Sequence, residues 1–394
     1  MARAEEFHRI QRLPPYVFEE VNAVKARLRA DGRDVIDFGM GNPDMPTPPH
    51  ILDKLIETVR KPKTNRYSAS RGIPGLRRAM ARYYARRFDV ALDADAEIVA
   101  TLGSKEAFAN LAQAITGPGD VVLAPDPAYP IHAFGFILAG GVIRAIPAPS
   151  PERYLAGLAD AAAGVAPSPT IMVLSYPSNP TAQTVDLDFY KEAVAIAERY
   201  DLWIFSDLAY AEIYFEDPPP SILQVPGARE RAVEVNSLSK TYSMEGHRVG
   251  MAVGAPRLIA ALARVKSYLD YGGYTPIQVA AAAALDGPQD CVAEIREIYR
   301  ARRDALVESF GRAGWAVPSP PASMFAWAPI PEPFRADGSV AFAKRLMEEA
   351  DVAVAPGFGF GDHGEGHVRI GLVENEQRIR QAARNVKRLL AEAR

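Results

Sequence analysis

Short apolar runs alternate along this chain with longer stretches of helical periodicity. The run EIVATL (97–102) precedes a helical pattern at 105–115, and further apolar runs follow at 120–125, 170–177, 202–207, 232–237 and 251–255, with helical stretches that include 188–200 and 258–269. Continuous apolar strands separated by helices are typical of βαβ units on a sheet that is buried on both faces. We therefore predict an α/β domain over about residues 45–285, with a mostly parallel sheet and helices on both faces.

The remainder of the chain has a different pattern. A long helical stretch at 288–313 and a proline-rich segment at 318–323 lead to strands at 324–330, 352–356 and 367–372 and helices at 340–350 and 376–393. These elements predict a small α+β domain made of residues 286–394. We expect residues 1–44 to complete it, because the sheet pattern starts only after them.

The composition excludes several classes of protein. The 394 residues carry 45 basic and 48 acidic side chains, for a formal net charge of −3. Nucleic-acid binding needs a basic excess to contact phosphates, so no nucleic-acid partner is expected. No apolar run approaches the ~20 residues of a membrane helix. The single Cys291 excludes an internal disulfide, and we expect a cytoplasmic protein without a metal site.

Polar side chains stand where the predicted strands end. Ligands bind outside the carboxyl ends of the strands in such sheets, so these side chains are candidates for one site. Each has an ordinary alternative: an N-cap for Ser104, a packing role for Tyr129, an Asx turn for Asn179 and a turn cap for Asp207. The candidate residues are Ser104, Tyr129, Asn179, Asp207, Tyr210, Ser237, Ser239, Lys240 and Arg248.

Together these groups match the needs of pyridoxal phosphate. That cofactor needs a lysine for covalent attachment and a partner for its ring nitrogen, for which we assign Lys240 and Asp207. It also needs an aromatic platform, donors to the phenolate oxygen and an anion cradle. We assign these roles to Tyr129, to Asn179 with Tyr210, and to Ser104 with Ser237, Ser239 and Arg248.

The order of these motifs resembles that of fold-type I pyridoxal-phosphate enzymes, specifically class I/II aminotransferases. The motifs are GNPD (41–44), YSASRGIPGLRRA (67–79), LGSKEA (102–107), PDPAYP (125–130), YPSNPT (176–181), SDLAY (206–210), SLSKTYS (237–243) and HVRIGL (367–372). Several segments, including RLPPYVF (12–18) and KSYLDYGGYTPIQVAA (266–281), look closer to bacterial alanine-forming (glutamate–pyruvate) aminotransferases. The diaminopimelate aminotransferases share many of them.

The resemblance implies further roles. Lys240 would move the proton at the substrate α-carbon, and Lys105 would join the phosphate cradle. Arg369 would bind the substrate α-carboxylate, a bidentate task that suits a guanidinium. Tyr16 and Gly41 would line the substrate side. Tyr67 would reach the phosphate of the neighbouring subunit in a homodimer.

The resemblance leaves the substrate open. We favour amino transfer between alanine or glutamate and a 2-oxo acid, in a ping-pong cycle. A diaminopimelate aminotransferase and a carbon–sulfur β-lyase are the alternatives. We expect Tyr271 to fill space near the substrate and to disfavour diaminopimelate. A regulator built on this fold would need an added DNA-binding domain, and no helix-turn-helix pattern precedes the fold.

One segment departs from the family pattern. Relatives usually have Met-Ala-Gly-Trp-Arg where this chain has Met244-Glu245-Gly246-His247-Arg248. We expect Glu245 to point to solvent or to pair with an arginine, and His247 to pack where the indole would. On this interpretation, Glu245→Ala and His247→Trp change cofactor dissociation less than ~10-fold, or ~1.4 kcal/mol.

Overall fold

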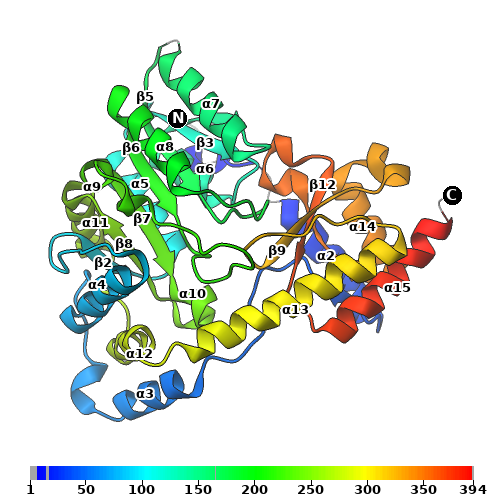
Figure 1. The fold of residues 1–394 in the computed structure, drawn as a ribbon, viewed down its shortest axis with the longest axis horizontal. Coiled ribbons are helices and arrows are strands. Elements are labelled where there is room, and N and C mark those ends of the chain that lie inside the picture. The colour runs from blue at the N-terminus through cyan, green and yellow to red at the C-terminus, as the bar shows by residue number, and fades with distance from the viewer. Residues whose placement is uncertain (1–6, 15–16, 165, 393–394) are drawn as a thin grey trace, which may run out of the picture.

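A seven-stranded sheet forms the centre of the larger part of the molecule (Figure 1). The computed structural model describes residues 7–14, 17–164 and 166–392. In spatial order the strands are β2 (Ile98–Thr101), β8 (Gly250–Gly254), β7 (Ala232–Ser237), β6 (Trp203–Asp207), β5 (Pro169–Ser175), β3 (Val121–Asp126) and β4 (Val142–Pro147). All neighbouring strands run parallel except β8, which is antiparallel to both β2 and β7. The predicted mostly parallel sheet is confirmed.

Both faces of this sheet are covered by helices, because its strands are apolar on both sides. Leu123 and Met172 face one buried cluster, whereas their neighbours Val122 and Ile171 face the other. On the first side lie α4 (Pro74–Phe88), α7 (Pro151–Ala163), α8 (Leu187–Arg199) and α12 (Thr275–Asp286), with α3 (Pro49–Val59) packed on α12. On the second lie α5 (Ser104–Ile115), α6 (Ile131–Ala139) and α11 (Pro256–Leu269).

The smaller lobe is built around a three-stranded antiparallel sheet of order β11-β12-β9. The long helix α13 (Asp290–Ala313) runs from the vicinity of α12 into this lobe and packs against α15 (Figure 1). The other elements of the lobe are β9 (Phe325–Pro329), α14 (Gly338–Ala350), β10 (Val352–Ala353), β11 (Ala355–Pro356), β12 (His367–Gly371) and α15 (Glu376–Glu392).

Residues near the N-terminus pack on this lobe. Strand β1 (Ile36–Asp37) pairs in parallel with β10, and α2 (Val17–Ala30) packs on α14. The apolar run 352–356, expected as one strand, is instead divided between β10 in one sheet and β11 in another. The domain limits near residues 45 and 285 stay a prediction.

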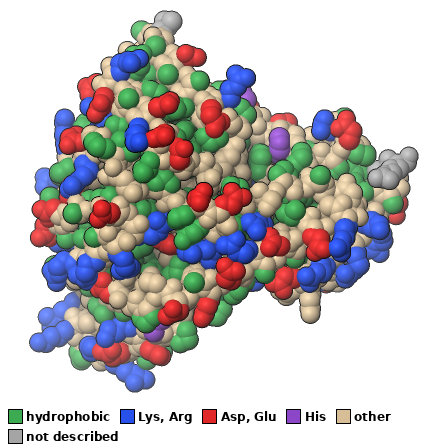
Figure 2. Space-filling model, in the orientation of Figure 1, with side chains coloured by type: hydrophobic (Ala, Val, Ile, Leu, Met, Phe, Trp, Pro, Cys, Tyr) green, Lys and Arg blue, Asp and Glu red, His purple; other side chains and the backbone are tan. Residues whose placement is uncertain are grey.

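The shorter helices are α1 (His8–Gln11), α9 (Ala228–Arg231) and α10 (Leu238–Thr241). Within the described ranges, no helix combines the length and apolar character needed to cross a membrane. Acidic and basic side chains are intermixed over the face shown in Figure 2.

Candidate active site

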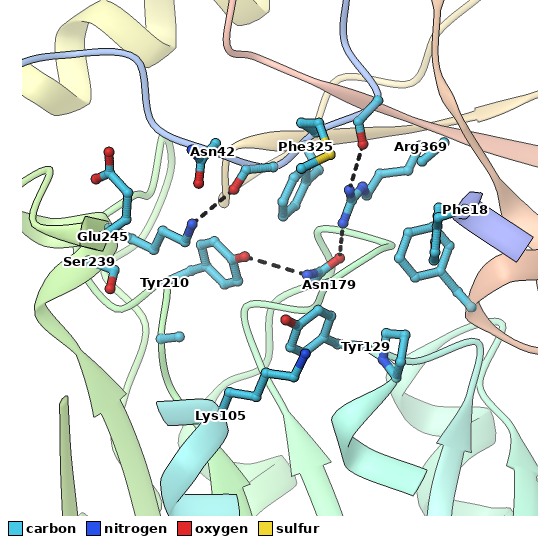
Figure 3. Close-up of a pocket in the computed structure, with 18 of the residues that line it drawn as sticks. Phe18, Asn42, Lys105, Tyr129, Asn179, Tyr210, Ser239, Glu245, Phe325 and Arg369 are labelled. Atoms are coloured by element: carbon cyan, nitrogen blue, oxygen red, sulfur yellow. Dashed lines mark hydrogen bonds between the residues drawn. The ribbon is translucent and has the colours of Figure 1, made fainter. Parts of the chain in front are cut away.

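A cavity of about 510 Å³ lies where the carboxyl ends of the sheet strands meet the small lobe (Figure 3). Strands β2, β3, β5, β6 and β7 all point the same way, so the loops that follow them converge here. The cavity is lined by Gly41, Ser104, Lys105, Tyr129, Asn179, Asp207, Tyr210, Ser237, Ser239, Lys240, Arg248 and Arg369, all of which the sequence had indicated.

Two predicted residues are not brought into this cavity by the chain itself. Tyr67 is 87% exposed on the surface, where its ring lies 4.8 Å from that of Tyr271. Its expected contact with a neighbouring subunit stays a prediction. Tyr271, expected near the substrate, is also exposed and does not line the cavity of its own chain. Tyr16 lies outside the described residues.

Lys240 extends into the cavity from α10, the short helix that follows β7. Its ammonium donates a hydrogen bond to the carbonyl oxygen of Gly41 at 2.9 Å. A Cβ on Gly41 would lie 2.7 Å from the Phe325 ring, so the close approach of this backbone requires glycine. Burial lowers the pKa of the Lys240 amine to about 8, and the Glu245 carboxylate opposes that shift. Roughly a tenth of the amine is therefore neutral and nucleophilic at pH 7, far more than for an ordinary lysine.

Asp207 closes β6, and both of its carboxylate oxygens are held. Oδ1 accepts the backbone N–H of Ala209 at 3.0 Å. Oδ2 lies 2.8 Å from Nε2 of His132, which is completely buried at the start of α6. An ionised carboxylate can only accept, so Nε2 carries the proton in this contact. These contacts fix the orientation of a carboxylate that lines the cavity.

Arg369 reaches the cavity from β12 of the small lobe. Its Nη1 donates to Asn179 Oδ1 at 2.8 Å and its Nη2 to the Gly39 carbonyl at 3.1 Å. The guanidinium lies 4.1 Å from the Phe325 ring centroid and 4.7 Å from that of Phe360. These contacts hold the planar fork in a fixed orientation, as carboxylate recognition requires.

Asn179 also connects to Tyr210, since its amide nitrogen lies 3.5 Å from the phenol oxygen. Figure 3 shows Asn179 and Tyr210 between Arg369 and Ser239, with Tyr129 beside Lys105. The Lys105 ammonium is 6.0 Å from the Tyr129 ring centroid. A planar ligand stacked on Tyr129 would thus have amide and phenol groups at its edge.

The opposite end of the cavity can hold an anion. Helix α5 begins at Ser104 with its N-terminus toward the cavity, and such an end offers free N–H groups and a positive dipole. The Arg248 guanidinium donates to the carbonyl oxygens of Leu102 and Glu245 at 3.2 and 2.9 Å. Ser237 and Ser239 line the same end. This arrangement has the donors and the charge for a phosphate.

Glu245 does not follow the sequence expectation. Its side chain lines the cavity on the same side as Ser239 and Asn42 (Figure 3). Arg248 contacts the carbonyl oxygen of Glu245 instead of its carboxylate. Its Oε2 is buried and accepts no hydrogen bond within the described part of the chain. Glu245 therefore adds a negative charge to a cavity otherwise rich in cations.

Sequence reasoning missed several groups at this site. His132 carried one weak signal, a lone histidine three residues after Tyr129 in an uncharged run. Phe18 and the ion pair of Lys25 with Asp37, at 2.8 Å, also line the cavity. Phe18 and Lys25 are in α2 and Asp37 is in β1. Both elements precede the sheet domain, and no local pattern places these residues beside the catalytic loops.

The donor set fits pyridoxal phosphate. A buried amine of lowered pKa, a fixed carboxylate and an anion cradle lie in one cavity, as this cofactor demands. The sequence matches the family "Aminotransferase class I and II" over residues 33–386. The chain belongs to this family, is a pyridoxal-phosphate-dependent aminotransferase, and has the fold-type I architecture.

The chain is similar to several individual proteins. It is 63% identical to the putative aminotransferase AatC of Rhizobium meliloti (strain 1021), over 99% of this chain and 96% of that protein. It is 52% identical to the glutamate-pyruvate aminotransferase AlaC of Escherichia coli (strain K12), over 97% and 93%. Identity to the LL-diaminopimelate aminotransferase of Moorella thermoacetica is 41%, over 98% of both. A mutant Thermus thermophilus aspartate aminotransferase superposes with a TM-score of 0.90 at 29% identity, covering 98% of this chain and 100% of that one.

Proposed function

We propose that this enzyme transfers the amino group between alanine or glutamate and the 2-oxo acids pyruvate or 2-oxoglutarate. The observation that carries the proposal is the 52% identity to a glutamate–pyruvate aminotransferase across 97% of the chain. Identity to the diaminopimelate aminotransferases is lower, at 41% for the Moorella protein. The residues of the cavity give each part of this reaction a candidate group.

Pyridoxal phosphate, when bound, supplies an electrophilic aldehyde carbon and a ring that accepts electron density from the substrate α-carbon. Lys240 accepts and returns the proton of the substrate α-carbon, since its amine is buried in the cavity and its pKa is lowered to about 8. Asp207, oriented by His132, would hold the proton of the ring nitrogen. Tyr210 and Asn179 would donate to the phenolate oxygen.

Arg369 binds the α-carboxylate of the amino acid. Its contacts with Asn179 and Gly39 keep the guanidinium in a fixed position relative to Lys240. The N-terminus of α5, Arg248, Ser237 and Ser239 would hold the phosphate. For the second carboxylate of glutamate, Lys105 is the candidate, because it lines the cavity beside Tyr129.

We also propose a cytoplasmic homodimer in which Tyr67 completes the neighbouring site. Support comes from a patch of exposed apolar side chains near residue 67, at the end of α11 and in the 270–274 loop that follows it. An exposed patch of this kind marks an interaction surface. Its members are Tyr67, Tyr268, Leu269, Tyr271 and Tyr274. Sedimentation equilibrium tests the dimer, and a fully active monomer would refute the role of Tyr67.

The test of the reaction is a panel of amino donors and 2-oxo-acid acceptors with the purified enzyme. We expect alanine and glutamate to be the better donors and diaminopimelate to be poor. Faster turnover with diaminopimelate would establish the first alternative, which the 41% identity to the Moorella enzyme favours as runner-up. Release of pyruvate and ammonia from cysteine-type substrates, without any acceptor, would establish a β-lyase.

A further inference from the structure

Lys266 is a charged residue buried entirely within the sheet domain, away from the cavity. Its side chain is 0% exposed. The ammonium lies 2.9 Å from Glu106 Oε1 in α5 and 2.9 Å from Asp270 Oδ2 just after α11. A buried ammonium is costly unless it is fully paired. Lys266 therefore fixes two segments at once, and each of them leads to a part of the cofactor site.

The first segment is the anion cradle. Glu106 uses its other oxygen, Oε2, to accept the backbone N–H of Leu102 at 2.9 Å. The carbonyl of the same residue accepts a hydrogen bond from Arg248 at 3.2 Å. The backbone N–H and C=O of Leu102 are thus both held, directly before Gly103 and the N-terminus of α5. Pairing with Lys266 holds the Glu106 carboxylate in the position that this requires.

The second segment begins at Asp270, directly after α11, and packs on the surface loop that contains Tyr67. Asp270 Oδ1 accepts the N–H of Gly272 at 2.6 Å, and the Asp270 carbonyl accepts the Ser70 hydroxyl. A Cβ on Gly272 would overlap the carbonyl oxygen of Ala69, so the two loops touch through their backbones. The Tyr67 and Tyr271 rings complete this contact. Lys266 thereby sets the position of the loop that carries Tyr67.

We propose that Lys266 is a positioning residue that ties the phosphate cradle of its own subunit to the Tyr67 loop offered to the neighbouring subunit. The inference rests on the proposed homodimer. Glu106 acts in cis on the cofactor of its own chain. Asp270 acts in trans on the cofactor of the partner chain. Lys266, bonded to both, couples the two sites of the dimer.

Lys266 makes two contacts, a cis arm through Glu106 and a trans arm through Asp270, and three variants separate them. Glu106→Gln weakens the cis arm, Asp270→Asn weakens the trans arm, and Lys266→Met removes both. Glu106→Gln and Asp270→Asn should each speed cofactor loss by ~10-fold, which corresponds to the loss of one charge-assisted hydrogen bond. Lys266→Met should speed it further, because it removes both contacts. Glu212→Gln is the matched control. Glu212 is a buried carboxylate that pairs with Arg87 and Arg296 at 3.1 and 3.4 Å, so its loss should lower the unfolding temperature without changing cofactor release.

Mixed dimers give the decisive measurement. One chain carries Lys240→Ala, and borohydride reduction then fixes cofactor only on the chain that keeps Lys240. The readout is the fraction of fixable cofactor left after dialysis, compared with a dimer whose only change is Lys240→Ala. We expect Asp270→Asn to speed loss only when it shares a chain with Lys240→Ala. Glu106→Gln should do so only when it is on the opposite chain.

The outcomes distinguish this inference from the proposed dimer. If the wild-type enzyme is monomeric by sedimentation, the dimer itself is wrong. If dimers form but Asp270→Asn acts equally in both arrangements, or not at all, the coupling by Lys266 is refuted. If Lys266→Met fails to fold, the two carboxamide variants still decide, because each keeps Lys266 and changes one arm only.

Discussion

Gly103→Ala is the substitution for which the structure gives the sharpest expectation. Gly103 stands between β2 and α5 with φ 85° and ψ 165°, a region almost confined to glycine. Any other residue there costs on the order of 1–3 kcal/mol. A new Cβ would also overlap Arg248 Nη2 and lie 2.9 Å from Cζ of the same guanidinium. Arg248 must therefore move away from the anion cradle.

Strain and displacement affect different measurements. The strain is present with or without cofactor, so it should lower the unfolding temperature of the cofactor-free enzyme. The displacement removes a hydrogen bond from Arg248 to the phosphate, which is worth ~1.5–3 kcal/mol. Cofactor affinity should therefore fall ~10- to 100-fold. Titration of cofactor-free enzyme, followed by the absorbance of bound cofactor, measures the affinity, and differential scanning fluorimetry measures the unfolding temperature.

Gly246→Ala is the matched control, because Gly246 also lines the cavity and a Cβ there would meet no atom within 4 Å. It should bind cofactor like the wild type. The reasoning is refuted if Gly103→Ala binds cofactor as tightly as the wild type. It is also refuted if Gly246→Ala weakens binding equally, since the effect would then not come from the overlap with Arg248.

Four further results are expected. Lys240→Ala should keep the wild-type fold by circular dichroism yet show no transamination, and residual activity at the wild-type rate would end the assignment. Recombination of cofactor-free enzyme with pyridoxal phosphate should speed up as pH rises through about 8, the pKa of the Lys240 amine. Glu245→Gln should lower the midpoint of this pH dependence, because the Glu245 carboxylate raises the pKa of Lys240. An unchanged midpoint would contradict this. Asp207→Asn should reduce kcat far more than cofactor affinity, and an unchanged kcat would make the carboxylate structural. Burial raises the pKa of Glu234 from 4.5 to about 7, so between these pH values the folded state binds a proton that the unfolded state has lost. As pH rises from 4.5 through 7, the free energy of unfolding of the wild type should therefore fall by roughly 3 kcal/mol relative to that of Glu234→Gln. Parallel stability curves for the two proteins would refute this.

The order of elements could be predicted because it depends on local sequence patterns. An apolar run of five or six residues followed by a helical stretch has few stable arrangements other than a βαβ unit. Once the strands are parallel, their carboxyl ends share one edge, which is why Asn179, Asp207 and Lys240 could be assigned to one site from their positions alone. Family resemblance then supplied their roles.

Other features depend on contacts between segments far apart in the chain. Nothing in the run 250–254 indicates that β8 is antiparallel, since its direction is set by the strands β2 and β7 on either side. The run 352–356 resembles one strand, but its two halves hydrogen-bond to β1 and β12 in different sheets.

Side-chain partners were the least predictable feature. His132 pairs with Asp207 across 75 positions and Lys266 with Glu106 across 160, and neither histidine nor lysine carries a local signal of its partner. The sequence by itself determined which residue types stand at the ends of the strands, because that depends on periodicity. The tertiary structure decided which of them touch, because burial of a charge is tolerated only where packing delivers the opposite charge to the same place.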